Sequence, residues 1–246
     1  MNENNSVFMK VWGEYACFTR PELKVERVSY PVMTPSAARG ILEAILFKPE
    51  FRWQVKEIRV LKEIQFINLR RNEVQGVILS RNVESAMRGI KRLSPLMADD
   101  TDNAGEGRTQ RQTIALRDIA YIIKAIPRPF ASFGVANLMK KYTKQFNRRV
   151  QRGQCFQQPY FGCREFVASF SLPEGNEKPI DESRELGWML YDIFDLNAKP
   201  VPILDSDLLE KHRQLSLFEG KLKNGILTVP DWHSEQVKRT VTREAR

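Results

Sequence analysis

The segment at residues 7–49 constrains the fold more than any other part of this 246-residue chain. Every second residue of 7–11 is apolar, which is the period of a half-buried β-strand. Thr34 can cap the free amide groups of a helix N-terminus, and Pro35 suits the first helical position because no donor is needed there. An apolar stripe follows, and Lys48-Pro49 ends it. The segment therefore predicts a strand, a basic loop containing aromatic residues, and a helix.

Further elements alternate along the chain after this helix. Residues 51–60 change phase near Lys56-Glu57, which predicts a strand with a β-bulge. A strand at 113–126, a helix at 135–152 and a strand at 164–172 follow. The order strand, helix, strand, strand, helix, strand is that of the ferredoxin-like split βαβ fold, which RNA-recognition modules share. We therefore expect an α+β, RRM-like architecture.

Two domains are expected from changes in composition along the chain. The ferredoxin-like domain spans residues 1–172 and contains an insertion at about 68–110, in which the acidic, glycine-containing stretch 99–107 is typical of a mobile loop. Residues 173–246 predict a small β-rich domain with a basic tail. Its expected strands are 188–194, 201–204 and 226–229, the last entered through the hairpin turn Lys223-Asn224-Gly225.

The charge of the chain favours an anionic partner. Its formal net charge is +9 and its pI is about 9.5, which indicates nucleic acid first and a membrane surface second. There is no apolar run of membrane length and no signal-peptide pattern at the start, so we expect a cytoplasmic protein without a membrane partner. The three cysteines form no CxxC pair, and only His212 and His233 could join them, so neither a metal site nor a cofactor is expected.

Several sequence blocks resemble the fifth CRISPR-associated (Cas) protein family, subtype I-C. The blocks are Phe-Thr-Arg-Pro-Glu at 18–22, Lys-Val-Glu-Arg-Val-Ser-Tyr at 24–30, Thr-Pro-Ser-Ala-Ala-Arg-Gly-Ile-Leu-Glu-Ala-Ile at 34–45, Arg-Arg-Asn-Glu-Val at 70–74, and Gln-Gln-Pro at 157–159 leading into Gly-Cys-Arg-Glu-Phe at 162–166. They occur in the family's order and cover most of residues 6–172. The resemblance implies a RAMP-superfamily protein.

By this resemblance the chain is an endoribonuclease that cuts precursor CRISPR RNA within the repeat. The reaction implied is metal-independent attack by the 2′-hydroxyl, which gives a 2′,3′-cyclic phosphate and a 5′-hydroxyl. The product would stay bound by its 5′ handle in the subtype I-C interference complex. The implied partners are precursor CRISPR RNA with its repeat hairpin, mature crRNA and the other subunits of that complex, with DNA as a further candidate.

The family's catalytic pattern matches this sequence only in part. The family has a tyrosine or histidine at the end of the first helix, where this chain has Leu46, and a lysine and a histidine at the end of a strand, where Lys124 is followed by Ala125. RNA cleavage without metal needs a proton acceptor and a cation near the phosphate. The candidates for these roles are Lys124, Lys48 and Tyr30, although Lys124 could be a solvated strand residue, Lys48 a favourable helix end and Tyr30 a packing residue.

The expected RNA-binding residues are cations in the blocks that carry the resemblance. They are Arg20, Lys24, Arg27, Arg39, Arg70, Arg71 and Arg164. Arg39 could instead form an ion pair on the helix surface, and Arg164 could be a paired strand residue. The cations within residues 140–152 have no acid among them and also favour RNA contact. Two other functions remain open: a non-catalytic subunit that caps the 5′ handle, which Leu46 favours, and a general RNA- or DNA-binding module.

Overall fold

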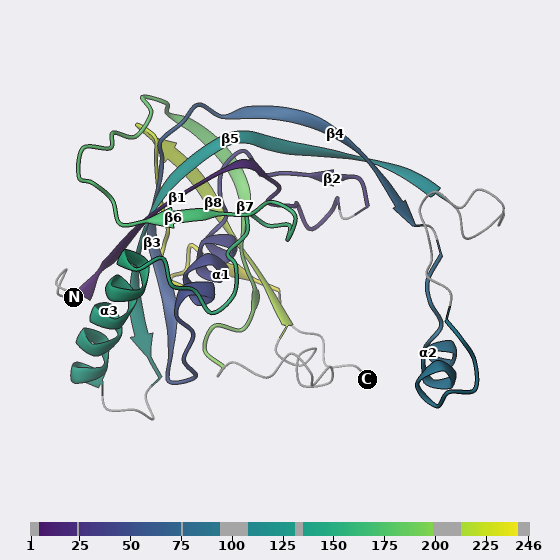
Figure 1. Ribbon diagram of the computed structural model, residues 1–246. Helices are drawn as coiled ribbons and strands as arrows, with labels where there is room; N and C mark the ends of the chain where they lie inside the picture. Colours follow the sequence, from purple (N-terminus) through teal and green to yellow (C-terminus); the bar gives the residue numbers. More distant parts are fainter. Residues whose placement is uncertain are drawn as a thin grey trace.

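The computed structural model describes residues 5–23, 25–74, 76–93, 108–130, 135–198 and 213–240 (Figure 1). Within these ranges there are three helices and a ten-stranded sheet. In chain order the elements are β1 (Val7–Ala16), β2 (Arg27–Val28), α1 (Pro35–Ile45), β3 (Phe51–Val60), β4 (Gln65–Val74), α2 (Ser80–Met87), β5 (Arg108–Pro129), α3 (Val135–Gln151), β6 (Ser169–Ser171), β7 (Arg184–Phe194), β8 (Arg213–Lys223), β9 (Ile226–Thr228) and β10 (Lys238–Arg239). No helix in these ranges is long and apolar enough to cross a membrane.

The sheet is built around β5, a curved strand of 22 residues (Figure 1). The main strand order is β10-β8-β9-β3-β5-β1-β6, while β2 and β4 also pair with β5 and β7 pairs with β8. The pairs are antiparallel, except that β2 runs parallel to β5. The predicted α+β class is confirmed, and the predicted element order is present as β1, α1, β3, β5, α3 and β6.

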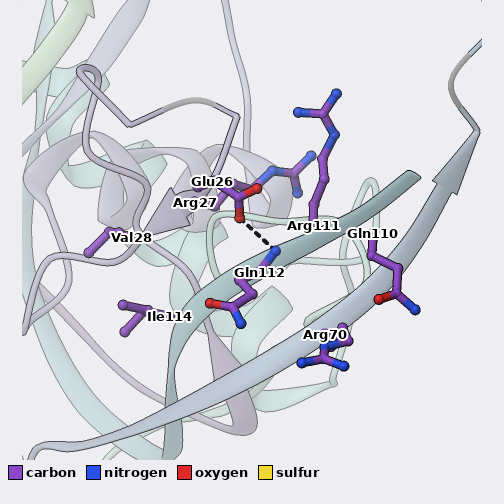
Figure 2. Close-up of a pocket in the computed structure, with 8 residues that line it drawn as sticks. All are labelled: Glu26, Arg27, Val28, Arg70, Gln110, Arg111, Gln112 and Ile114. Atoms are coloured by element: carbon purple, nitrogen blue, oxygen red, sulfur yellow. Dashed lines mark hydrogen bonds between the residues drawn. The ribbon is translucent and has the colours of Figure 1, made fainter.

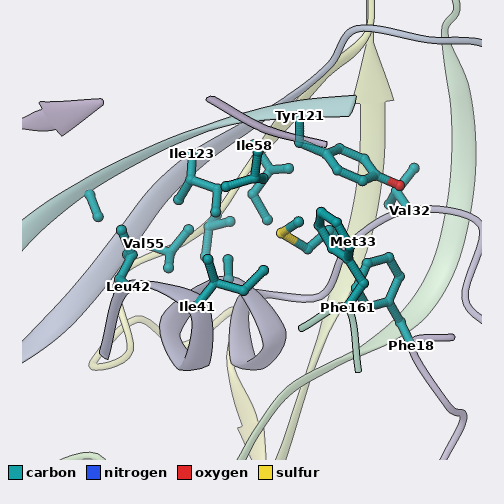
Figure 3. Close-up of a cluster of buried hydrophobic side chains, with 14 of the residues drawn as sticks. Phe18, Val32, Met33, Ile41, Leu42, Val55, Ile58, Tyr121, Ile123 and Phe161 are labelled. Carbon is teal, nitrogen blue, oxygen red and sulfur yellow. The ribbon is translucent and has the colours of Figure 1, made fainter. Parts of the chain in front are cut away.

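The first helix begins and ends as the sequence predicts. The Thr34 hydroxyl accepts a hydrogen bond from the Ala37 amide at 3.2 Å, and Pro35 opens the helix. The apolar stripe packs under the sheet, where Ile41 and Leu42 lie among core side chains of β3 and β5 such as Ile58 (Figure 3). Burial of this stripe, rather than intrinsic propensity, holds the helix in place.

The third helix packs at the far end of β5. Tyr142 stacks on Phe51 with a centroid distance of 4.5 Å, and Phe146 meets Trp53 edge-on at 4.8 Å. The predicted β-bulge in β3 is confirmed by a register shift between Val55 and Glu57. These contacts fix α3 to the end of the sheet where β3 begins.

Two expectations from the sequence are corrected, and a third is not tested. The predicted insertion at 68–110 begins inside β4 and ends inside β5. Residues 65–74 pair continuously with 108–117 in a long hairpin, and α2 lies in the segment that joins the two strands. The predicted strand at 164–172 is reduced to β6, because residues 162–165 form a turn. The acidic stretch 99–107 lies outside the described residues.

The C-terminal strands join the same sheet rather than forming a separate one. β9 pairs with β3, with Ile58 opposite Leu227, so the sheet is continuous across the predicted boundary at 172/173. The predicted hairpin turn is confirmed, since Asn224 and Gly225 both have positive φ between β8 and β9. The expected strand at 201–204 lies outside the described residues, and β8 is a strand that the sequence reasoning did not predict.

Candidate nucleic-acid interface

A groove lies where β2 ends beside the outer part of β5 (Figure 2). It encloses ≈ 390 Å³. Its lining residues come from β2, β4 and β5 and from the residue before β2, and they are Glu26, Arg27, Val28, Arg70, Gln110, Arg111, Gln112 and Ile114. The side chain of Glu26 accepts a hydrogen bond from the backbone N–H group of Gln112 in β5, at 2.6 Å (Figure 2). The groove therefore presents guanidinium groups, amides and one carboxylate.

The arginines beside the groove form a network with two glutamates. Glu165 contacts Arg71 and lies 3.5 Å from Arg27. Glu73 lies 3.4 Å from Arg71 and 3.0 Å from Arg111. All five side chains are partly exposed, so these ion pairs are screened by solvent and hold their partners weakly. A phosphate group can therefore replace a carboxylate on these guanidinium groups, whose planar fork suits phosphate oxygens.

A tight turn places the 162–165 segment next to β2. Gly162 has φ +80°, and a Cβ atom there would lie only 2.0 Å from the carbonyl oxygen of Cys17. The sulfur of the next residue, Cys163, accepts a hydrogen bond from Arg27 Nη1 at 3.4 Å. The Cys163 thiol also donates a hydrogen bond that lowers the pKa of Cys17 to about 7. The turn thus places both Cys163 and Glu165 in contact with the Arg27 guanidinium group at the groove.

Four of the predicted RNA-binding residues gather in this region. Arg27 and Arg70 line the groove, Arg71 belongs to the network with Glu165, and Arg164 is exposed in the adjacent turn. Arg164 is therefore not the paired strand residue of the alternative reading. Lys24 lies outside the described residues.

Arg20 is placed differently from the groove residues. Its guanidinium lies 4.6 Å from the ring centroid of Tyr30, and one of its nitrogens lies 3.8 Å from Glu22. The side chain is partly exposed, so it remains a candidate for RNA contact at the loop between β1 and β2.

Arg39 does not belong to the exposed interface, and this corrects the expectation from sequence. Its guanidinium forms two hydrogen bonds to Asp192 of β7, at 2.8 and 3.0 Å, and a third to Glu43 at 2.8 Å. Burial disfavours the charged form, but the carboxylates of Asp192 and Glu43 outweigh it and raise the pKa of Arg39. Arg39 is therefore a structural link between α1 and β7.

Tyr30 is also corrected as a catalytic candidate, because only 2% of it is exposed. Burial raises the pKa of its hydroxyl, which makes it a poorer proton acceptor. Lys48 is partly exposed in the short loop that joins α1 to β3. Leu46, where the related family has a proton-transfer residue, is fully buried, and its carbonyl oxygen accepts from Trp53 Nε1 at 3.0 Å.

Lys124 lies at mid-sheet beside an aromatic ring and a second cation. It is half-buried on β5, opposite Phe8 of β1 and Glu57 of β3. Its Nζ atom lies 5.6 Å from the Phe8 ring centroid, and the Arg59 guanidinium lies 5.9 Å from the same centroid. Arg59 is bound to Glu57 at 2.5 Å. The structure thus brings Lys124 together with Arg59 but not with Lys48. Lys48 comes before β3, whose first residue, Phe51, pairs with Pro129 at the far end of β5.

Sequence reasoning missed Gln110, Arg111 and Gln112, because it assigned the first of them to an insertion and began the strand at residue 113. Polar residues of 108–112 pair across the hairpin with polar residues of β4. Two polar segments that could pair in this way were the sequence signal for a hairpin.

Among the described residues, no group of three or more His, Cys, Asp or Glu side chains is placed to hold a metal ion.

Comparison with known proteins places the chain in a family. A model of the Cas5d family, described as CRISPR-associated protein (Cas5), matches residues 6–230. The chain belongs to the Cas5d family. It is 42% identical over 245 residues to the CRISPR pre-crRNA endoribonuclease Cas5d of Mannheimia succiniciproducens, which covers 96% of this chain and 99% of that protein. It is 46% identical over 229 residues to the protein of the same description from Thermus thermophilus, which covers 90% of both chains.

Solved structures support the fold of this Cas5d-family chain. A crystal structure of a CRISPR-associated protein has a TM-score of 0.59 at 21% identity and covers 95% of this chain and 96% of its own. A functionally uncharacterized protein from Streptococcus mutans has a TM-score of 0.57 at 19% identity over the same shares of the two chains. At these identities the likeness concerns the arrangement of helices and strands alone.

Proposed function

We propose that this Cas5d-family chain is an endoribonuclease that binds and cleaves precursor CRISPR RNA. The observation that carries the proposal is the identity of 42–46% to two proteins described as CRISPR pre-crRNA endoribonucleases, over at least 90% of each chain. After cleavage the chain would keep the 5′ handle of the mature crRNA within the subtype I-C interference complex.

A ferredoxin-like unit within the larger sheet is part of this proposal. The elements β1, α1, β3, β5, α3 and β6 follow the split βαβ order, and their strands lie in the spatial order β3-β5-β1-β6 with antiparallel neighbours. The central pair, β1 and β5, carries Phe8 and Lys124 directly opposite each other. Sheets of this kind bind single-stranded RNA through aromatic and cationic side chains on one face.

The RNA is proposed to run along β5 from the groove toward Lys124. Guanidinium groups can bind phosphates or stack on bases, and the amides of Gln110 and Gln112 can pair with base edges. The groove and Lys124 are separated by about 33 Å of strand between Ile114 and Lys124, at roughly 3.3 Å per residue. A single strand of several nucleotides can cover this path.

Lys124 is proposed to act at the phosphate that is cut. In 2′-hydroxyl attack a base removes the hydroxyl proton, the 2′-oxygen bonds to phosphorus, and the bond to the 5′-oxygen breaks as that oxygen gains a proton. Negative charge on the phosphate oxygens grows during this step, and a nearby cation stabilises it. Lys124 and the neighbouring Arg59 offer this charge, and Lys48 is the second candidate.

Cleavage by the purified protein tests the proposed function. We expect the wild-type protein to cut a labelled repeat-containing RNA in the presence of EDTA, leaving a 2′,3′-cyclic phosphate on one product and a 5′-hydroxyl on the other. Tight binding of the repeat without any cut would reject the endoribonuclease and support the non-catalytic subunit. Equal binding of RNA or DNA without a repeat would support the general nucleic-acid-binding module.

The groove can be tested separately through Arg111, which only the structure places in it. We expect Arg111→Gln to weaken binding of single-stranded repeat RNA by about threefold to tenfold, and to reduce the slope of log K against log salt by roughly 0.7, as for one lost phosphate contact. Fluorescence anisotropy over a series of KCl concentrations measures both quantities.

Lys221→Gln is the matched control for Arg111→Gln. Lys221 is likewise a cation paired with glutamates, with Nζ 3.5 Å from Glu185, but it lies on β8 away from the groove. The control should leave affinity and slope unchanged. An equal effect of the two variants would mean that net charge, rather than the groove, determines binding.

A further inference from the structure

The exposed face of α3 carries a row of cations that the proposed groove does not use. Lys140, Lys144 and Arg148 of α3, and Arg152 directly after it, recur every fourth residue, and each is exposed. Four helical residues advance by about 6 Å and turn by about 40° beyond a full turn, so the row rises about 18 Å while it winds by roughly 120° around the helix. Lys141 is exposed beside the row, with its Nζ atom 5.6 Å from the Tyr142 ring centroid.

The opposite face of α3 fixes the helix to the body of the protein. Tyr142, Phe146 and Val150 are buried in the core at the same four-residue spacing. Thr143 adds a hydrogen bond from its hydroxyl to the carbonyl oxygen of Asn5 at 3.2 Å. The row of cations is therefore held on a rigid support, and its geometry does not depend on a partner.

The cations of this row form no ion pair in the described part of the protein. The helix contains no aspartate or glutamate, and no ion pair joins the row to another element there. The arginines of the network beside the groove differ, because Arg27, Arg71 and Arg111 are all paired with glutamates. Like charges four residues apart cost a helix about 0.2–0.5 kcal/mol per pair. An anionic partner would offset this repulsion.

The composition of the row indicates which polyanion fits. Single-stranded nucleic acid is usually bound by aromatic side chains that stack on its bases. The aromatic residues of α3, Tyr142 and Phe146, are buried, so the exposed face of the described helix offers charge without a stacking surface. Duplex RNA keeps its bases inside and is recognised through its shape, phosphates and 2′-hydroxyls. A rigid backbone of this kind can be contacted by a row of cations that winds gradually around the helix.

The row is also remote from the groove. In Figure 1, α3 lies on one side of the molecule and the outer part of the β4–β5 hairpin extends to the other. Along β5, about 50 Å of strand separates Ile114 of the groove from Pro129, where α3 packs, at roughly 3.3 Å per residue. A ligand on α3 therefore leaves the groove accessible.

We propose that the exposed cations of α3 bind the phosphate backbone of an RNA duplex, which in the substrate would be the stem of the repeat hairpin. This inference rests on the proposed function for the identity of the RNA, but not for the binding itself. The stem is held by α3 through charge and shape, while the single strand that leaves it enters the path along β5. The row then increases affinity for the hairpin without taking part in the chemistry.

The test is a triple variant, Lys140→Gln/Lys144→Gln/Arg148→Gln, assayed by fluorescence anisotropy with a labelled RNA hairpin over a series of KCl concentrations. We expect affinity at low salt to fall about tenfold or more, and the slope of log K against log salt to decrease by roughly 2–3 for three lost contacts. The rate constant of cleavage at saturating RNA should be unchanged. The replaced side chains are exposed, so thermal unfolding should show a folded protein of at least wild-type stability.

The matched control replaces three exposed cations elsewhere, Lys62→Gln/Arg184→Gln/Lys221→Gln, which lowers the net charge equally. An equal loss in this control overturns the proposal, as does an unchanged slope in the α3 variant. An equal loss for single-stranded RNA of the same length overturns the assignment to a duplex. A loss confined to a DNA duplex of matching sequence overturns the assignment to RNA. If the wild type binds the hairpin through α3 but never cuts it, the proposed function fails while this inference stands.

Discussion

Arg39→Ala is expected to lower the free energy of unfolding by about 3–5 kcal/mol, as for the loss of one partner from a buried ion pair. The side chain of Asp192 is 2% exposed and that of Arg39 is 12% exposed, so the carboxylate left behind would be buried without its cation. Asp192 also caps the amides of Ile193 and Phe194, so disturbing it affects the end of β7. Urea denaturation followed by circular dichroism measures the change.

Two further variants separate the ion pair from simple packing at Arg39. Glu43→Gln removes the more exposed partner, whose side chain is 22% exposed, and should cost about 0–1 kcal/mol. The double variant Arg39→Met/Asp192→Asn removes both charges but keeps an oxygen that can accept from the amides of Ile193 and Phe194, so it should recover part of the stability lost in Arg39→Ala. A small effect of Arg39→Ala, similar to that of Glu43→Gln, would contradict the structural role and return Arg39 to the set of RNA-binding candidates.

The Arg39–Asp192 contact also shows why the sequence could not decide between RNA binding and an ion pair for Arg39. Its partner is 153 residues away on β7, and nothing in local spacing indicates that β7 packs on α1. Tyr30 was assigned to catalysis for a similar reason, because an aromatic between cations resembles a stacking residue until the sheet buries it. Local patterns identify the type of side chain, but its exposure depends on contacts distant in sequence.

The parts of the fold that sequence predicted well depend on local chemistry. The Thr34 cap and Pro35 define the start of α1, the phase change near Lys56 defines the bulge in β3, and the turn Asn224-Gly225 defines the last hairpin. Each of these signals involves a few neighbouring residues whose backbone preferences decide the structure.

The strand segments that sequence missed show no regular apolar alternation. In residues 70–72 of β4 and 110–112 of β5, arginine, glutamine and asparagine pair across the strands, whereas Ile67 and Leu69 nearer the start of β4 pack against the core. In β8 the buried positions include Ser216 and Gly220 beside Phe218 and Leu222, which weakens the expected alternation. This matters for function, because the groove is built from the polar strand ends that hydrophobic periodicity cannot detect.

Lys124→Ala is expected to slow cleavage of precursor RNA at saturating concentration by about 10²–10⁴-fold, which is the usual contribution of a group that transfers a proton or supports the charge in the transition state. The dissociation constant for the uncut RNA should change little, since the groove and α3 are untouched. Single-turnover cleavage and anisotropy measure the two effects on the same preparation. Lys56→Ala is the matched control, a partly exposed lysine on β3 whose Nζ atom lies 3.3 Å from Asp231.

Lys124→Arg distinguishes the two roles that Lys124 could have. An arginine keeps the positive charge but cannot give up a proton in a protein. Substantial activity in Lys124→Arg would assign Lys124 to charge stabilisation, in parallel with Arg59, and leave proton transfer to another group. Loss of activity equal to that of Lys124→Ala would favour proton transfer by the lysine itself. Full activity in Lys124→Ala would contradict both roles and make Lys48, beside the buried Leu46, the residue to replace next.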